Sequence, residues 1–99
     1  MKIDLEKINV VHNIRARRFE IKVDQLLAVL EYEMHGNRIV FTHTGVPPAL
    51  EGQGVASRLA RVALEHAREN SYKVVPACEF MDVYIRRHRE YQPLVRGEG

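Results

Sequence analysis

The sequence predicts an α+β fold with a mixed sheet, in which an antiparallel meander of strands is followed by helix, strand and helix. Three observations support this class. Apolar and polar residues alternate with a period of two in the first half of the chain, as half-buried strands require. Glycines and prolines then interrupt the pattern between residues 44 and 54. An amphipathic helical period follows.

The first half is expected to form four strands, at residues 9–13, 18–23, 26–34 and 38–42. The alternation is clearest at 18–23, where Phe19, Ile21 and Val23 share one face. Residues 24–25 and 35–37 are expected to form turns. A helix over 26–34 is the alternative, because Leu, Glu and Met also favour helices.

The second half changes to a helical period. Residues 44–48 are expected to form a loop, because proline lacks the N–H group that a paired central strand needs. A helix is expected over 55–70, a short buried strand over 73–75, a second helix over about 80–87 and a turn over 90–95. His66 borders the apolar side of the first helix and is expected to be a core or boundary residue. That apolar face is expected to hold Val55, Ala56, Leu59, Ala60, Val62, Ala63 and Ala67.

Composition narrows the function classes. The 99 residues suit one domain, residues 1–99, and the formal charge of +2 fits an anionic small ligand but is too weak to argue for nucleic acid. The single cysteine, Cys78, excludes an intramolecular disulfide and a cysteine zinc cluster, and the histidines lack metal-ligand spacing, so we expect no metal and a reducing, cytoplasmic setting. No apolar stretch suits a membrane span or a signal peptide, so we expect no membrane partner.

A glycine turn, Gly52-Gln53-Gly54, directly precedes the best helix. The first N–H groups of a helix have no internal partners, and the helix dipole places partial positive charge there. Glycines remove the side chains that would keep a phosphate from the backbone. The turn is therefore a candidate cradle for a diphosphate, although two glycines before a helix also occur as a simple tight turn.

The segment Gly52-Gln53-Gly54-Val55-Ala56 resembles the acetyl-CoA signature of the GNAT superfamily of N-acetyltransferases, whose pattern is Arg/Gln-x-x-Gly-x-Gly/Ala. Gly54 and Ala56 match the last two positions, whereas Glu51 departs from the first. The departure at Glu51 has little effect on the expected binding of the cofactor, because this family holds the diphosphate mainly with backbone N–H groups.

Further segments between about residues 19 and 95 resemble a subfamily of minimal, single-domain GNAT-like proteins. These are His43-Thr44-x-Val46, Leu50-Glu51-Gly52-x-Gly54-x-Ala56, Val75-Pro76-x-Cys78, Tyr84-Ile85 and Arg87-His88-x-Glu90-Tyr91. Arg89 stands where a proline often follows the histidine. The resemblance implies the GNAT-like acyl-CoA N-acyltransferase fold, with acetyl-CoA as co-substrate and its pantetheine arm in an opening between two splayed strands. The residues that it implies for cofactor binding are Thr44, Val46, Gly52, Gln53, Gly54, Val55, Ala56, Ser57, Arg87 and His88.

The same resemblance implies three candidates for catalysis. Cys78 follows a strand that borders the acetyl group in GNAT topology, so it is a candidate nucleophile or pocket-lining group; a small buried hydrophobe is the alternative. His43 is expected to point toward the ligand cleft as a base and as the activator of Cys78, since an ordinary histidine pKa of about 6.5 suits that task. A structural histidine is the alternative there.

Tyr84 is the candidate proton donor to the departing thiolate, and a packing role beside Phe80 and Ile85 is its alternative. The basic cluster around Arg87 and His88 is a candidate contact for the 3′-phosphate or diphosphate of CoA, whereas Arg86 is expected to be a solvated helix-end cation.

Two functions follow from these residues. The first is N-acetyl transfer from acetyl-CoA to a primary amine of an unidentified acceptor, a small molecule or a protein lysine. The second is a non-catalytic module or partner subunit that binds CoA or acetyl-CoA. A nucleic-acid-binding domain is a third class, but no aromatic sheet motif or glycine-rich RNA signature supports it.

Overall fold

The computed structural model describes residues 2–96 and shows the predicted order of strands, helix, strand and helix. Met1 and residues 97–99 of the predicted domain lie outside the described residues. Short 3₁₀ helices occur at Leu5–Lys7, Pro48–Leu50 and Arg89–Tyr91. The strands are β1 (Val11–Asn13), β2 (Arg18–Val23), β3 (Leu26–His35), β4 (Arg38–Gly45) and β5 (Lys73–Pro76), and the helices are α1 (Val55–Glu69), α2 (Glu79–Arg87) and α3 (Gln92–Arg96).

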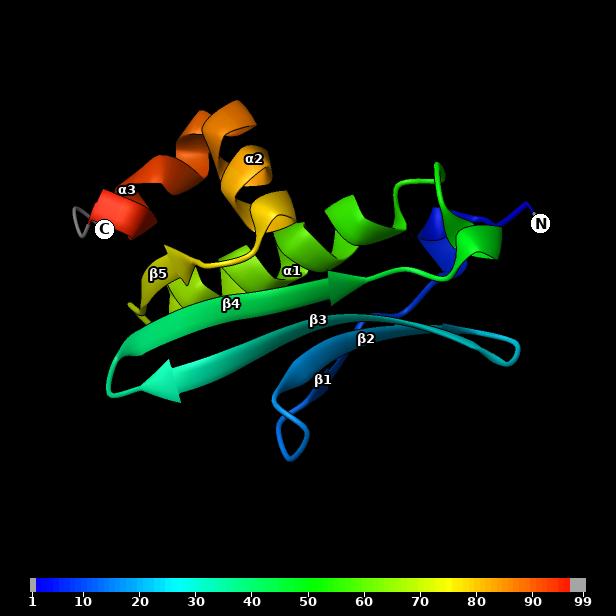
Figure 1. Ribbon diagram of the computed structural model, residues 1–99, viewed down its shortest axis with the longest axis horizontal. Coiled ribbons are helices and arrows are strands. Elements are labelled where there is room, and N and C mark those ends of the chain that lie inside the picture. The colour runs from blue at the N-terminus through cyan, green and yellow to red at the C-terminus, as the bar shows by residue number, and fades with distance from the viewer. Residues whose placement is uncertain (1, 97–99) are drawn as a thin grey trace.

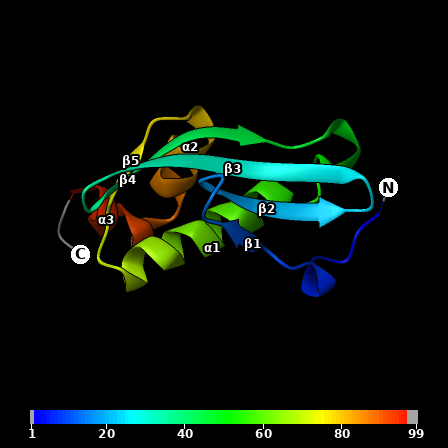
Figure 2. The same ribbon diagram turned by 90° about the horizontal axis from the view of Figure 1, so that it is seen from below.

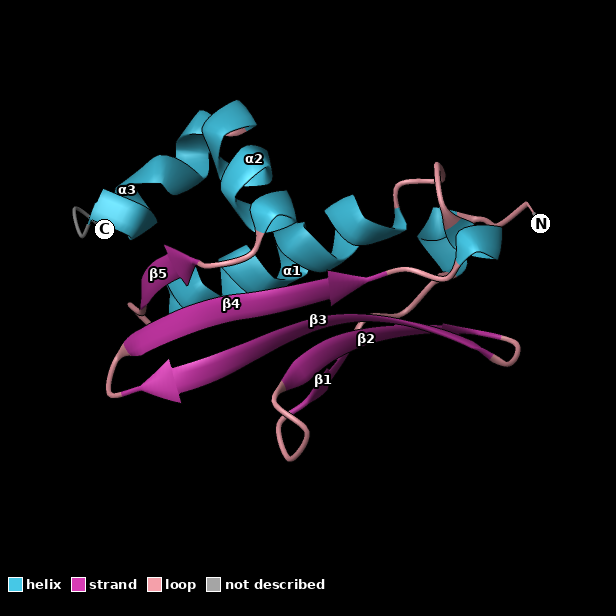
Figure 3. Ribbon diagram, in the orientation of Figure 1, coloured by secondary structure: helices cyan, strands magenta, loops and turns pink. Residues whose placement is uncertain are grey.

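The strands form one sheet in the order β1-β2-β3-β4-β5. The first four pair antiparallel, and β5 joins β4 in parallel after the α1 crossover. Figure 2 shows β2, β3 and β4 running side by side. The three helices lie on one side of this sheet (Figures 1 and 3). Among the described residues, no helix combines the length and the apolarity that crossing a membrane requires.

The core lies between the sheet and α1. Phe19 and Ile21 on β2 are buried, as are Ala28, Leu30 and Tyr32 on β3. The helical alternative for residues 26–34 is wrong, because this segment pairs with β2 on one side and with β4 on the other. Backbone pairing on both sides outweighs the helix propensity of its Leu, Glu and Met residues.

Helix α1 ends at Glu69, one residue before the predicted end, with Asn70 as its C-cap. Its predicted apolar face omitted Leu64, which is fully buried, and included Val62, which is only partly buried. Leu64 lies four residues after Ala60 and three before Ala67, so it belongs to the same buried face, and α1 also contacts α2.

Strand β4 is longer than predicted, because Thr44 and Gly45 belong to it and not to the loop. A β-bulge makes this possible: Phe41 pairs with Tyr32 and His43 with Glu31, so Thr42 is left as the extra residue on β4. The bulge reverses which alternate residues of β4 face the helices. Before it Phe41 faces the core, and after it Thr44, opposite the fully buried Leu30, takes that side.

Strands β4 and β5 separate at the bulge. Their pairing ends at Phe41 and Pro76, after which β4 continues while the chain leaves β5 toward α2 (Figure 1). Residues 42–45 therefore have β3 on one side and, in the part of the chain that the structure describes, no strand on the other. This divergence opens the sheet at the end where the glycine turn lies.

Candidate functional site

The glycine turn adopts the backbone that its sequence predicts. Gly52 and Gly54 have φ values of +75° and +83°, in the left-handed region that favours glycine. Gly54 is the N-cap of α1, and within residues 2–96 no side-chain hydrogen bond caps the helix there. The first N–H groups of α1 are therefore available to donate hydrogen bonds to a ligand at the turn.

An inner cavity of about 230 Å³ opens beside this turn, between the end of β4, the start of α1 and the first turn of α2. Most of the residues predicted to bind the cofactor line it, which brings Val46 together with the glycine turn across the divergence of the sheet. Phe80 completes the wall and was not among the predicted site residues. The lining consists of Val46, Leu50, Glu51, Gly52, Gly54, Val55, Ala56, Ser57 and Phe80.

Gln53 differs from its neighbours because its side chain turns toward the N-terminal segment. Its Oε1 accepts a hydrogen bond from the Ile3 N–H at 2.9 Å, and its Nε2 donates to the Ala49 carbonyl at 3.4 Å. The Leu5 carbonyl in turn accepts from Arg58 Nη2 at 3.1 Å. The sequence showed no sign that the N-terminal segment packs against the glycine turn.

Cys78 lies on the helix side of the sheet, where β4 and β5 diverge. It is the N-cap residue of α2 and is partly buried. Its Sγ lies 3.4 Å from the hydroxyl oxygen of Thr44 on β4, an interaction in which either atom can donate. The bulge causes this contact, because it turns Thr44 toward α2.

The structure does not bring His43 to Cys78, so the activating role expected from the sequence has no contact here to support it. Since Thr44 faces the helices, its neighbour His43 faces the opposite side of the sheet, and its side chain is exposed. Gly45 shares that side: a Cβ at Gly45 would lie 3.0 Å from Nε2 of His43. The one-residue bulge, invisible in the sequence, decided the direction of the imidazole.

Tyr84 lines a second, outer cavity of about 420 Å³ that runs over the exposed side of α1. Tyr84 is only 7% exposed. Burial, and then the charge of Glu90, raise the pKa of Tyr84 above its ordinary value. Cys78 does not line this cavity. The full lining is Leu5, Gly54, Ser57, Arg58, Arg61, Tyr84, His88, Glu90 and Tyr91.

The residues of the basic cluster at the end of α2 lie in different surroundings. His88 lines the outer cavity, its Nδ1 donates to the Tyr84 carbonyl at 2.7 Å, and its ring stacks on that of Tyr84 at 3.8 Å. Arg87 is exposed and lines neither cavity. Arg86 forms an ion pair with Asp82 at 3.0 Å, in keeping with a surface role.

Two other expectations concern histidines and metals. His66 packs edge-on against His12, with ring centroids 4.6 Å apart, and is a partly buried boundary residue as predicted. Within the described part of the chain, His, Cys, Asp and Glu side chains do not gather in groups of three that could hold a metal ion.

This chain is similar to known proteins in both sequence and structure. The family model described as GCN5-related N-acetyl-transferase matches residues 18–94. The chain is 37% identical over 92 residues to protein NATD1 of Homo sapiens, covering 90% of this chain and 81% of that protein. It is 36% identical over 84 residues to NATD1 of Gallus gallus, covering 82% and 76%.

A solved structure agrees. The solution structure of a GCN5-like protein from Staphylococcus aureus superposes with a TM-score of 0.70 at 32% identity, covering 87% of this chain and 85% of that one. The α+β fold with a mixed five-stranded sheet and the resemblance drawn from the sequence are thereby confirmed. The family model covers more than half of the chain, and the relatives align over most of their own length. The chain therefore belongs to the GCN5-related N-acetyltransferase family.

Proposed function

We propose that this protein binds acetyl-CoA in the opening between β4 and β5 and transfers the acetyl group to a primary amine. The divergence of these strands at the mouth of the glycine turn is the observation that carries the proposal. The diphosphate lies at the N-terminus of α1, where unpaired N–H groups and the helix dipole favour an anion.

The free edge of β4 suits the pantetheine arm. Among the described residues, no strand pairs with residues 42–45 on the side away from β3, so their outward N–H and C=O groups are available to an extended chain that carries amides. Val46 and Phe80 supply apolar walls beside the glycine turn. This path runs from the glycine turn toward Thr44 and Cys78.

Acetyl transfer has two possible routes at this site. In the covalent route, the Cys78 sulfur attacks the thioester carbonyl, the bond to the CoA sulfur breaks, and CoA leaves as its thiol after taking up a proton. An amine then attacks acetyl-Cys78 and regenerates the cysteine. In the direct route the amine attacks the thioester itself, and Cys78 only lines the pocket.

Both routes require proton transfers. His43, on the sheet face away from the helices, is the proposed base for an amine that approaches from that face. Tyr84 remains the proposed donor to the CoA thiolate, since its ring centroid lies 6.0 Å from that of Phe80, which lines the inner cavity. Replacement by Gln and by Phe respectively tests these roles, with the expected loss in kcat and little change in acetyl-CoA affinity.

The alternative is a non-catalytic acetyl-CoA-binding module. Among the described residues no helix covers the sheet face on which His43 lies (Figure 1), so the chain itself supplies little wall for a small acceptor. A large acceptor could use that open face instead. Release of CoA thiol, measured against a panel of small amines, polyamines and lysine peptides, separates catalysis from binding alone.

Titration of isotopically labelled protein with acetyl-CoA tests the binding proposal. We expect the amide signals of residues 53–57 to shift, while those of the distant Gly36-Asn37 turn stay in place. If residues 53–57 do not move at millimolar acetyl-CoA, the proposal is wrong.

Intact-mass measurement after incubation with acetyl-CoA tests the covalent route. The wild-type protein is expected to gain one acetyl group, and Cys78→Ala to gain none. Thr44→Val is the companion variant, because it removes the hydroxyl beside Sγ and keeps the thiol. Turnover by Cys78→Ala at the wild-type rate would instead establish direct attack.

A further inference from the structure

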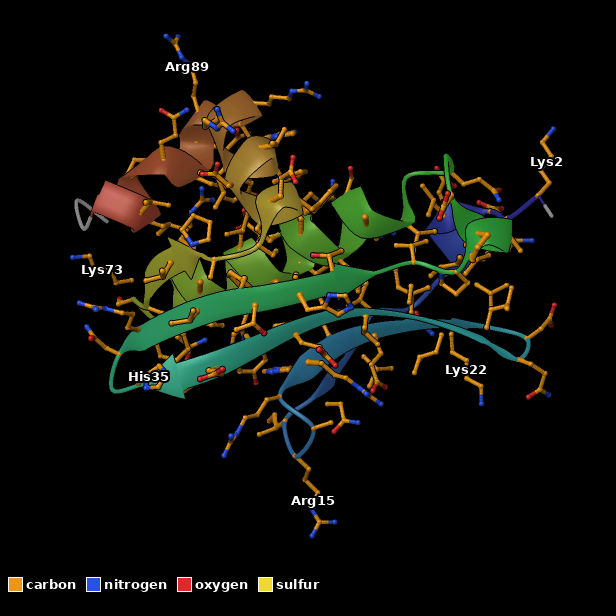
Figure 4. The ribbon with its side chains drawn as sticks, viewed as in Figure 1. Lys2, Arg15, Lys22, His35, Lys73 and Arg89 are labelled. Atoms are coloured by element: carbon orange, nitrogen blue, oxygen red, sulfur yellow. The ribbon has the colours of Figure 1, made fainter. Side chains whose placement is uncertain are left out.

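The N-terminal segment packs against the start of α1. Residues 2–8, which we call the N-terminal strap, precede β1, and Figure 4 shows Lys2 projecting outward at the end of the molecule that holds the glycine turn. Ile3, Leu5 and Ile8 are partly buried against the core, whereas the residues between them are exposed. The strap therefore has one face that packs on the domain and one that faces solvent.

Two hydrogen bonds join the strap to the glycine turn and to α1. The Ile3 N–H donates to Gln53 Oε1 at 2.9 Å, and Arg58 Nη2 donates to the Leu5 carbonyl at 3.1 Å. These bonds connect residues 50 and 53 positions apart in the sequence. The strap is thus held at the turn by tertiary contacts and not by its place in the chain.

Between these two bonds, the Leu5 side chain packs on Gly54. A Cβ built on Gly54 would lie 3.1 Å from Leu5 Cδ1, and both residues line the outer cavity. Leu5 therefore fills space beside the bare backbone of the glycine turn. A phosphate that approached Gly54 from this side would meet an apolar group, which offers an anion no hydrogen bond in exchange for its water.

The strap has few contacts that resist displacement. Its 3₁₀ helix, Leu5–Lys7, has three residues, and none of the three is buried. The cap of this helix is local, because the Asp4 carboxylate accepts from the Glu6 N–H at 3.0 Å within the strap itself. Segments with few buried apolar groups and exposed hydrogen bonds open at a low cost in free energy.

We propose that the strap is an autoinhibitory element: Leu5 covers Gly54 in the free protein, and acetyl-CoA binds after the strap has been displaced. The proposal rests on the proposed acetyl-CoA function. Because only the open fraction of the protein is competent to bind, the apparent Kd equals the intrinsic Kd divided by that fraction. The closed strap therefore weakens the binding of acetyl-CoA.

Calorimetric titration of acetyl-CoA into wild type, Leu5→Ala and Leu27→Ala tests the proposal. Leu27 on β3 lines neither cavity, so its variant is the same truncation at a site away from the glycine turn. Leu5→Ala is expected to bind about fivefold more tightly than wild type, because half-burial of a leucine contributes about that factor to closing the strap. Leu27→Ala is expected to bind as wild type does. Circular dichroism verifies that each variant is folded.

Hydrogen exchange of the Ile3 amide gives a second measurement. This N–H is bonded to Gln53 in the free protein, so displacement of the strap is expected to speed its exchange when acetyl-CoA saturates the protein. Slower exchange in the complex would overturn the inference, because the strap would then close over the ligand and not yield to it.

The titrations separate the strap from the proposed function. Equal affinities of wild type and Leu5→Ala would overturn the inference and leave the proposed function standing. Binding by Leu5→Ala but not by wild type would support both. Binding by neither would overturn both.

Discussion

Replacement of Gly54 by alanine separates backbone strain from ligand binding. Gly54 has a φ of +83°, and an added Cβ would lie 3.1 Å from the Leu5 Cδ1 atom. Holding alanine in the left-handed region costs about 1–2 kcal/mol, and the end of the leucine side chain can move aside. For a domain of this size that cost corresponds to a fall in Tm of about 4–8 °C per kcal/mol.

Gly36→Ala is the matched control. Gly36 has a φ of +64°, and nothing lies within 4 Å of an added Cβ, so the same strain arises in the β3–β4 turn. Gly54, in contrast, lines both cavities. A methyl group there would keep a phosphate from the backbone, and loss of one charge-assisted hydrogen bond weakens acetyl-CoA binding by about tenfold or more.

Thermal unfolding and calorimetric titration measure the two effects separately. Both variants are expected to lose stability to a similar extent, and only Gly54→Ala to lose affinity for acetyl-CoA. Equal affinities in the two variants would refute the placement of the diphosphate at Gly54. An unchanged Tm in Gly36→Ala would refute the strain argument itself.

Four further variants test the core and its electrostatics. Leu64→Ala, at a fully buried site, is expected to lower the free energy of unfolding in urea by about 2–5 kcal/mol. Leu27→Ala is the control, because Leu27 is 38% exposed, and it is expected to lower that free energy by about 0.5 kcal/mol or less. Similar losses of stability in the two variants would contradict the observed packing of α1. Burial, and then the adjacent histidine on α1, lower the pKa of His12 below its ordinary 6.5. The unfolded state then binds that proton more readily, so the free energy of unfolding is expected to fall with pH below 6.5. His12→Gln should flatten this slope in Tm measurements, and an unchanged slope would argue against the assignment. Tyr91→Phe removes a 2.7 Å hydrogen bond to Glu65 and is expected to cost about 1–3 kcal/mol by urea unfolding, so an unaltered stability would show that solvent replaces the bond.

Periodicity was sufficient for most of the fold. The alternation of Phe19, Ile21 and Val23 predicted β2, and the change to a helical period predicted the start of α1 at Val55. Both signals are local, since they follow from which face of one element is buried. Leu64 was left out of the predicted face, although it lies four residues after Ala60 and three before Ala67 and is fully buried.

The candidate site was likewise predictable from the sequence only in part. The glycine turn was readable from the sequence, because a left-handed backbone at a helix N-terminus has a direct chemical signature in Gly52 and Gly54. The pairing of Thr44 with Cys78 was not readable, because these residues meet only after β4 and β5 have been placed side by side.

The sequence by itself therefore determined the class of fold, the family and the turn that is proposed to receive the diphosphate. Only the tertiary structure decided which side chains face that turn. A single extra residue on β4 turned Thr44 toward Cys78 and His43 away, and the packing of α2 beside α1 enclosed Arg58 and Arg61 in the outer cavity. The physical reason is that a strand's side chains alternate with a period of two, so one bulge reverses every direction beyond it without leaving any mark in the pattern of residues.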